Sequence, residues 1–393
     1  MACLKEGKTN LNEGKTEKKD RTEEKKTDER ASAAFAGFCS LQKGVYDREE
    51  ILLKKPRQYP AIDVAKYICA LLVVAIHTFP FLDISPSFNL FFISTVCRIA
   101  VPFFFVSSSF FLFRKLNRKE KTPAENQEVI KTYLKRLGIL YLAWTVIYIP
   151  YTIWNYAEAG FSWLGLLGWI RDFFLNGSYY HLWFLPALML GVVIVWHLYE
   201  KKGIVYALEV ALGLYLVGYL INIYAPFWES LAGVKVVYGF FTKTLVTARD
   251  GIFFAPIFVV IGAAAARLRR PALKASAIGF AVSFLCLILE VTLYAALGVL
   301  NDKSCMFLSL IPALYFLFNM LLKVKIPNKP VYRSMRQDST LIYVSHILFA
   351  RVLLIMLPNV HLVVYLGTLA CAQVFSSTII RLSDRYKWLK WLM

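Results

Sequence analysis

Long apolar runs alternate with short polar connections along most of this chain. From residue 60 onward there are ten such runs of about 18 to 25 residues, close to the roughly 20 residues that a helix needs to cross the hydrocarbon core of a bilayer. The pattern predicts an all-α, polytopic membrane protein with about ten transmembrane helices. The expected spans lie at about 60–80, 88–113, 133–152, 181–199, 204–223, 251–267, 274–297, 305–322, 339–357 and 361–380.

The stretch before the first run has a different character. It contains KEGKTNLNEGKTEKKDRTEEKKTDER, which mixes both charge signs and has no aromatic residue, so it offers too little apolar surface to offset the chain entropy lost on folding. We expect a disordered, charged cytoplasmic tail over residues 1–57, followed by a membrane domain over residues 58–393. Because the first apolar run is too long for a signal-peptide core, we expect it to act as an uncleaved anchor.

Composition and charge agree with a membrane protein and predict its orientation. Hydrophobic residues make up 58% of the chain and the mean hydropathy is +0.52, whereas roughly 45–50% apolar residues is usual in soluble domains. The connections on one side of the predicted spans hold 23 Lys and Arg, and those on the other side hold 5. The positive-inside rule therefore predicts that both termini are cytoplasmic. The net charge of +19 then reflects the topology of a protein in the plasma membrane. We therefore expect the lipid bilayer, and not nucleic acid, as a partner. The oligomeric state stays open.

The sequence predicts no metal site and no bound cofactor. The seven cysteines lie far apart, mostly inside apolar runs, which favours a role as small apolar side chains. The five histidines lack the HxxxH or HExxH spacing that places two metal ligands on one helical face.

The first predicted span, AIDVAKYICALLVVAIHTF, contains Asp63, Lys66 and His77. Ionisable groups are costly at membrane depth and usually face a bundle interior or a wet cavity, so each is a candidate functional residue. Lys66 and His77 are 11 residues apart, which places them about 20° apart around a helix and about 16 Å apart along it. We expect both on one face, with Lys66 near the cytoplasmic end and His77 near the outer end.

The second predicted span contains Arg98, Pro102 and three serines in FFISTVCRIAVPFFFVSSSFFLF. Arg98 lies too deep to reach the surface and cannot lose its charge, so it needs an anionic or carbonyl partner. Pro102 is expected to kink the helix, and the hydroxyls of residues 107–109 could satisfy the backbone groups that it frees. A nucleophilic serine is the less favoured alternative, because no G-x-S-x-G elbow surrounds the run.

Later spans add His181, Glu290, His346 and Arg351, most of them at a depth similar to that of the first-span histidine. Three histidines that converge with an arginine favour catalysis or substrate contact over isolated packing. Glu290 and Arg351 are more simply explained as partners of each other or of a neighbour.

Two long outer connections, residues 153–180 and 224–250, are rich in Trp and Tyr, as expected of segments at a membrane interface. They could form a lid over an outward-facing site. Arg249, at the end of the second connection, is a possible supporting residue of that site, as is Asp63.

These residues carry a resemblance to the acyltransferase 3 family that extends over most of the predicted membrane domain. The family's first-span signature is an Arg followed by a His, and Lys66 and His77 occupy that spacing with Lys in place of Arg. The stretch CRIAVPFFFVSSSFFL resembles the family's Arg, Pro-Phe-Phe and Ser-Gly pattern, with Ser109 where Gly is usual. HLWFL from His181 and STLIYVSH ending at His346 also resemble family segments.

The resemblance implies a membrane O-acyltransferase that moves an acyl group, such as acetyl, from acyl-CoA to a hydroxyl of a cell-envelope glycan or similar extracytoplasmic acceptor. His77 would serve as the general base, and Arg98 would stabilise the thioester carbonyl or hold the acceptor. His181 and His346 would orient His77 or the substrate, and Lys66 would contact coenzyme A. Covalent transfer through His77 is an equal variant.

Two alternatives stay open. The stretch TARDGIFFAPIFVVIGA also resembles the membrane half of the serine/alanine racemases linked to vancomycin resistance, which are credited with serine uptake, so the same polar groups could line a transport path for a small solute such as serine. The chain could also be a scaffold on an inactive acyltransferase fold, an alternative that Lys66 and Ser109 favour. The weak internal repeat signal and the family resemblance favour the enzyme.

Overall fold

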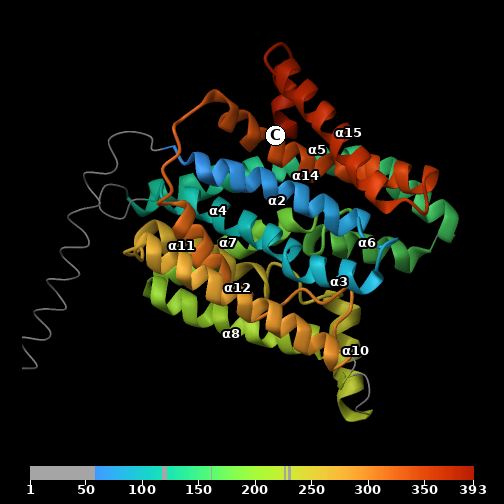
Figure 1. The fold of residues 1–393 in the computed structure, drawn as a ribbon, viewed down its shortest axis with the longest axis horizontal. Coiled ribbons are helices and arrows are strands. Elements are labelled where there is room, and N and C mark those ends of the chain that lie inside the picture. Colours follow the sequence, from blue (N-terminus) through green and yellow to red (C-terminus); the bar gives the residue numbers. More distant parts are fainter. Residues whose placement is uncertain (1–57, 117–121, 161, 225–226, 229–231) are drawn as a thin grey trace, which may run out of the picture. The chain divides into compact units, whose positions relative to one another are not determined.

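The computed structural model describes residues 58–116, 122–160, 162–224, 227–228 and 232–393, so the predicted tail at 1–57 lies outside the described residues. Within them the regular structure is helical, as the apolar runs predict (Figure 1). The helices are α2 (Pro60–Thr78), α3 (Pro86–Thr95), η2 (Cys97–Ile99), α4 (Ala100–Phe113), α5 (Pro123–Ala159), α6 (Trp163–Leu175), α7 (Phe184–Lys202), α8 (Ile204–Ile223), α10 (Ala232–Leu245), α11 (Ala255–Arg267), α12 (Leu273–Ala296), α13 (Leu310–Leu321), α14 (Pro330–Met356), α15 (His361–Leu382) and η3 (Lys387–Leu392).

Each of the ten predicted spans contains an apolar helix. Eight spans in the described part of the chain are long and apolar enough to cross a membrane, with α3, η2 and α4 counted as one. The other two helices are shorter, since α11 has 13 residues and α13 has 12. The protein is therefore an all-α, polytopic membrane protein in which two of the ten predicted spans are shortened at their starts.

Two carboxylates explain the shortened starts. Asp250 Oδ1 accepts hydrogen bonds from the backbone N–H groups of Ile252 and Phe253, which holds a turn where the sequence predicts the first residues of a span. Glu290 on α12 accepts hydrogen bonds from the N–H groups of Leu308 and Ser309. Leu308 and Ser309 directly precede α13, so Glu290 holds the turn that leads into this helix.

Prolines and capping side chains determine where several of the helices begin. Proline occupies the first position of α2, α3, α5 and α14, where its missing N–H costs nothing and its fixed φ suits a helix. The α5 helix also has a capping box, in which Thr122 and Glu125 each accept a hydrogen bond from the other's backbone N–H.

The centre of the bundle forms where α11 packs against α4, α7 and α8. Every residue from Ala255 to Ala265 is buried. The approach to α4 is close at Gly262, where an added Cβ would lie 2.0 Å from Ser109 Oγ and 2.2 Å from the carbonyl oxygen of Val106. Glycine on α11 thus accommodates the serine that stands in α4.

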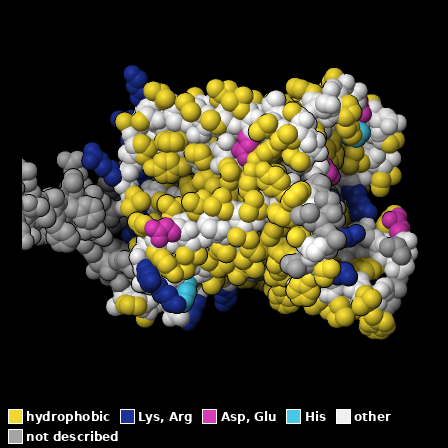
Figure 2. Space-filling model, turned by 90° about the horizontal axis from the view of Figure 1, so that it is seen from below, with side chains coloured by type: hydrophobic (Ala, Val, Ile, Leu, Met, Phe, Trp, Pro, Cys, Tyr) yellow, Lys and Arg dark blue, Asp and Glu magenta, His cyan; other side chains and the backbone are white. Residues whose placement is uncertain are grey.

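Apolar side chains cover the outside of the bundle. Figure 2 shows a face on which hydrophobic side chains predominate and the Lys and Arg side chains lie mainly toward its edges. Helix α12 contributes exposed leucines at 285, 289 and 293, spaced one turn apart. A bilayer is the solvent that such a surface requires.

Candidate active site

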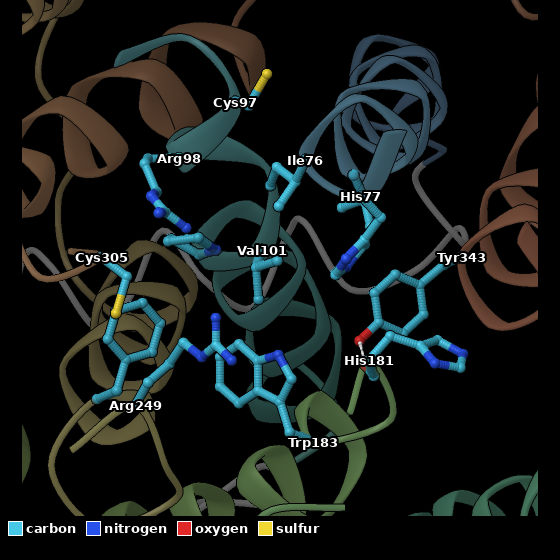
Figure 3. Close-up of a pocket in the computed structure, with 13 residues that line it drawn as sticks. Ile76, His77, Cys97, Arg98, Val101, His181, Trp183, Arg249, Cys305 and Tyr343 are labelled. Carbon is cyan, nitrogen blue, oxygen red and sulfur yellow. Dashed lines mark hydrogen bonds between the residues drawn. The ribbon is translucent and has the colours of Figure 1, made fainter. Parts of the chain in front are cut away.

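A cavity of about 40 Å³ lies where α2, η2 and α14 meet the connections that precede α7, α11 and α13 (Figure 3). Arg98, Arg249 and His77 point toward this space from different elements. The cavity is lined by Val73, Ile76, His77, Cys97, Arg98, Val101, Pro102, His181, Trp183, Arg249, Phe254, Cys305 and Tyr343.

The structure brings together the three histidines that the sequence singled out. The ring centroid of His346 lies 5.2 Å from that of His77 and 5.4 Å from that of His181. His77 and His181 line the cavity, and His346 on α14 is fully buried beside them. The ring of Tyr180 packs edge-on against His77 at 5.3 Å, so three segments far apart in the chain meet at one point.

Backbone carbonyls fix the protonated nitrogen of two of these rings. His346 Nδ1 lies 2.7 Å from the carbonyl oxygen of Tyr343 and 3.1 Å from that of Ile342, and His181 Nε2 lies 3.1 Å from that of Val344. Since a carbonyl only accepts, each of these nitrogens carries the proton. The remaining nitrogens, His346 Nε2 and His181 Nδ1, are buried without a partner among the described residues and present lone pairs.

Arg98 reaches the cavity from a break in the second span. Pro102 has no N–H for the carbonyl of Arg98 four residues earlier, and the chain forms the short η2 turn between α3 and α4 at this point. Arg98 Nη2 donates to the carbonyl oxygen of Asp302 at 2.9 Å, which is a carbonyl partner of the kind that its depth predicts. Its Nε is buried without a partner in the described part of the chain.

The hydroxyls of Ser107 and Ser109 do not bind the backbone groups that Pro102 leaves without a partner. Ser107 Oγ donates to the carbonyl of Phe104 and Ser109 Oγ to that of Val106. Both carbonyls lie beyond Pro102, so the prediction that the serines satisfy the groups freed by the proline is wrong. The hydroxyls instead bond one turn back within their own helix.

Arg249 enters the cavity from the connection before α11. Its guanidinium carbon lies 4.8 Å from the ring centroid of Trp183, within the range of a cation–π contact. Its Nε is buried without a partner among the described residues. None of the residues that line the cavity is acidic, so two permanent cations face the same small space.

Lys66 does not line the cavity. It lies in the opposite half of α2, near Asp63, whose Oδ2 is 3.9 Å from Nη1 of Arg336 on α14. Asp63 is buried and its Oδ1 has no partner in the described residues. The structure therefore separates the predicted site residues into an arginine and histidine cavity and a second polar group with Lys66 and Asp63.

Glu290 and Arg351 lie outside the cavity and do not pair with each other. Glu290 anchors the start of α13, and Arg351 donates to Tyr179 Oη at 2.5 Å and to Asn155 Oδ1 at 2.6 Å. Their neighbours therefore account for both groups, as the simpler prediction stated.

Nine of the thirteen lining residues were not foreseen as site residues, and four of these nine carry a polar or sulfur atom: Cys97, Trp183, Cys305 and Tyr343. Tyr343 packs near His346, and its hydroxyl donates to the carbonyl of His181 at 2.5 Å. The spacing of Tyr343 and His346, three residues apart on a helix, places them on one face and is the signal that could have identified Tyr343.

The two long connections are bound to each other. Arg171 on α6 donates to the carbonyl of Lys243 on α10 at 2.6 Å, and Asn176 Nδ2 donates to that of Leu245 at 3.2 Å. The segment that follows α6 supplies His181 to the cavity, and the segment that follows α10 supplies Arg249. The predicted lid remains a hypothesis, but its two parts are joined beside the residues that they position.

Three curated relatives, all racemases of Enterococcus species, are similar to this chain. An amino-acid racemase of Enterococcus faecalis is 32% identical over 287 residues, which cover 73% of this chain and 39% of that protein. A serine/alanine racemase of Enterococcus gallinarum is 29% identical over 266 residues, which cover 67% of this chain and 37% of that protein. The chain thus spans less than half the length of these relatives. No solved structure matches it.

The family comparison covers the described membrane bundle almost completely. Residues 59–390 match the family profile described as an acyltransferase domain. That range contains every residue that lines the cavity, together with the polar group at Lys66. The chain therefore belongs to the acyltransferase 3 family and is a membrane-embedded member of it.

Proposed function

We propose that the protein moves an acyl group, in the simplest case acetyl, from acyl-CoA to a hydroxyl of a cell-envelope glycan or similar acceptor at the plasma membrane. The observation that carries this proposal is the pairing of His77 with two guanidinium groups in one small cavity. Acyl transfer needs a base for the hydroxyl proton and positive charge for the oxyanion that forms on the thioester carbonyl. His77 and Arg98 supply these two groups.

In this mechanism the acceptor oxygen attacks the thioester carbonyl while its proton passes to His77. The negative charge that develops on the carbonyl oxygen is stabilised by Arg98, which the Asp302 carbonyl holds in place. Collapse of the intermediate breaks the carbon–sulfur bond, and the proton on His77 passes to the departing thiolate. His346 Nε2, an unpartnered acceptor beside the His77 ring, is suited to orient that ring.

The donor would extend along α2. Lys66 lies about 16 Å from His77 along the helix, toward the end of the bundle where Arg336 also lies. We propose that this group receives the phosphate-bearing end of coenzyme A, so that the pantetheine arm follows the face that Lys66 and His77 share. An ammonium gives phosphate a point charge and no bidentate contact, so Lys66→Arg is expected to keep or raise transfer.

The test is transfer of label from radiolabelled acetyl-CoA to crude envelope glycans by purified protein in detergent or proteoliposomes. His77→Ala should lower the rate by about 10²- to 10⁴-fold, the usual contribution of a general base. His197→Ala is the matched control, because His197 is exposed on α7 and lies outside the cavity. No transfer by the unmodified protein would refute the proposal.

The similarity to serine/alanine racemases favours a second candidate, in which the same cavity passes a small amino acid such as serine across the membrane. Accumulation of labelled serine in proteoliposomes, without acyl transfer, would select that function. Acyl transfer without accumulation would select the enzyme.

A further inference from the structure

Two guanidinium groups share the cavity without an acidic partner. The ion pairs found among the described residues join Arg171 to Asp172, Arg336 to Asp63 and His361 to Asp83. None of them includes Arg98 or Arg249, and both of those arginines have a buried Nε without a partner there.

Three acidic residues lie near the cavity, and none of them forms an ion pair with Arg98 or Arg249. Asp250 follows Arg249 directly, but its Oδ1 accepts two backbone N–H groups of the turn before α11. Asp302 is exposed, and Arg98 binds its backbone carbonyl. Glu290 accepts two backbone N–H groups at the start of α13. Among the described residues, therefore, no carboxylate forms an ion pair with either arginine, and the exposed Asp302 side chain acts on Arg98 only through its charge at longer range.

The chemistry of the proposed function neutralises only part of this charge. Arg98 and Arg249 carry two positive charges, and cations removed from water need opposite charge or hydrogen bonds to be stable. The oxyanion that forms during acyl transfer brings one negative charge. A second negative charge on a substrate would balance the pair.

The donor is poorly placed to bring that charge. The phosphates of coenzyme A lie at the far end of the pantetheine arm from the thioester, and in the proposed function they lie near Lys66. The second charge is therefore expected on the acceptor, close to the hydroxyl that is acylated.

Resting on the proposed function, we infer that the acceptor is a carboxylate-bearing alcohol, such as a hydroxy acid or an acidic sugar, whose carboxylate binds between Arg98 and Arg249. Guanidinium groups bind carboxylates through two parallel hydrogen bonds. The cation–π contact with Trp183 helps to hold the Arg249 guanidinium in the cavity.

The experiment measures binding to purified protein without acyl-CoA, using probes that differ in the carboxylate. The pairs are methyl glucuronide against methyl glucoside, and glycerate against glycerol, with inorganic phosphate as a further anion. We expect at least one carboxylate to bind about 10- to 100-fold more tightly than its neutral partner, the range for a hydrogen bond to a charged group.

Variants assign the preference to the cavity. Arg249→Gln should abolish it and Arg249→Lys should retain part of it, while the matched control Arg269→Gln, which removes an exposed arginine outside the cavity, should leave it unchanged. Equal binding of each pair, a preference that survives in Arg249→Gln, or tighter binding of phosphate than of either carboxylate would overturn the inference.

The two proposals fail separately. A carboxylate preference without label transfer from acetyl-CoA would support the anion site and refute the acyltransfer proposal for these acceptors. Transfer that depends on His77, together with equal use of acidic and neutral acceptors, would refute the carboxylate inference alone.

Discussion

The hydrogen bonds of His346 allow its two nitrogens to be tested separately. Nδ1 donates to the carbonyls of Tyr343 and Ile342, whereas Nε2 is a free acceptor beside His77. Asparagine at position 346 can keep a donor near Nδ1 but places nothing near Nε2. Glutamine can place an acceptor near Nε2 but loses the donor at Nδ1.

The two variants should therefore change different properties: His346→Asn should lower the rate of transfer, and His346→Gln should lower the stability. One neutral hydrogen bond contributes about 0.5–1.5 kcal/mol, which corresponds to a factor of about 2 to 13. His346→Asn should lower kcat by that factor with KM for acyl-CoA and stability near their original values. His346→Gln should keep kcat within about twofold but lose about 0.5–1.5 kcal/mol of stability.

The assays are label transfer at saturating acetyl-CoA and thermal unfolding in the same detergent, with His197→Asn and His197→Gln as controls. A positioning role for Nε2 would be refuted if His346→Asn kept full kcat while His346→Gln lost it. It would also be refuted if both variants lost activity only in proportion to stability, because His346 would then be a packing residue.

Three further predictions concern the scaffold. Glu290→Ala should destabilise the bundle by about 1–3 kcal/mol, because two N–H groups in the turn before α13 lose their acceptor and each such hydrogen bond contributes about 0.5–1.5 kcal/mol. Unfolding in denaturant measures this, and exposed Thr292→Ala should change little. Gly262→Ala should sharply reduce the yield of folded protein, since the added Cβ meets backbone and side-chain atoms of α4. Gly213→Ala is the control and should be tolerated, because no atom lies within 4 Å of its added Cβ. Equal yields of the two variants would contradict the packing of α4 against α11. The hydrogen bond from His361 holds the pKa of Asp83 below its ordinary value of 3.8. The stabilising contribution of this contact is therefore complete above pH 3.8 and is lost as the pH falls through the lowered pKa of Asp83. Asp83→Asn should flatten the acid side of a plot of Tm against pH, and an unchanged slope would count against this contact.

The sequence predicts the candidate site to the extent that membrane depth makes polar residues conspicuous. His77, Arg98, His181 and His346 each stand out in an apolar span, because ionisable groups there are rare and costly. Their convergence follows from similar depth, although depth alone does not say which faces meet. That information lies in packing such as the contact of α2 with α14.

Other features left no comparable signal in the sequence. Trp183 and Cys305 belong to residue types that are common in membrane helices and their connections. Glu290 binds backbone groups 18 and 19 residues later in the chain, and every residue has such groups, so no side-chain pattern marks the contact. Each of the ten apolar runs contains a helix, as predicted, but the turn before α13 depends on this long-range contact and the turn before α11 on the local bonds of Asp250.

The short α11 helix also bears on how the protein is assembled in the membrane. Its 13 residues span about 20 Å, less than the roughly 30 Å of the hydrocarbon core, and its buried surface faces protein on all sides. Lipid alone is therefore a poor environment for it. Its main partners α4, α7 and α8 precede it in the chain, so the groove that receives α11 can exist before α11 is synthesised. Synthesis from the N-terminus to the C-terminus then supplies α11 with its packing surface in time, and a change in the order of the spans would remove that benefit.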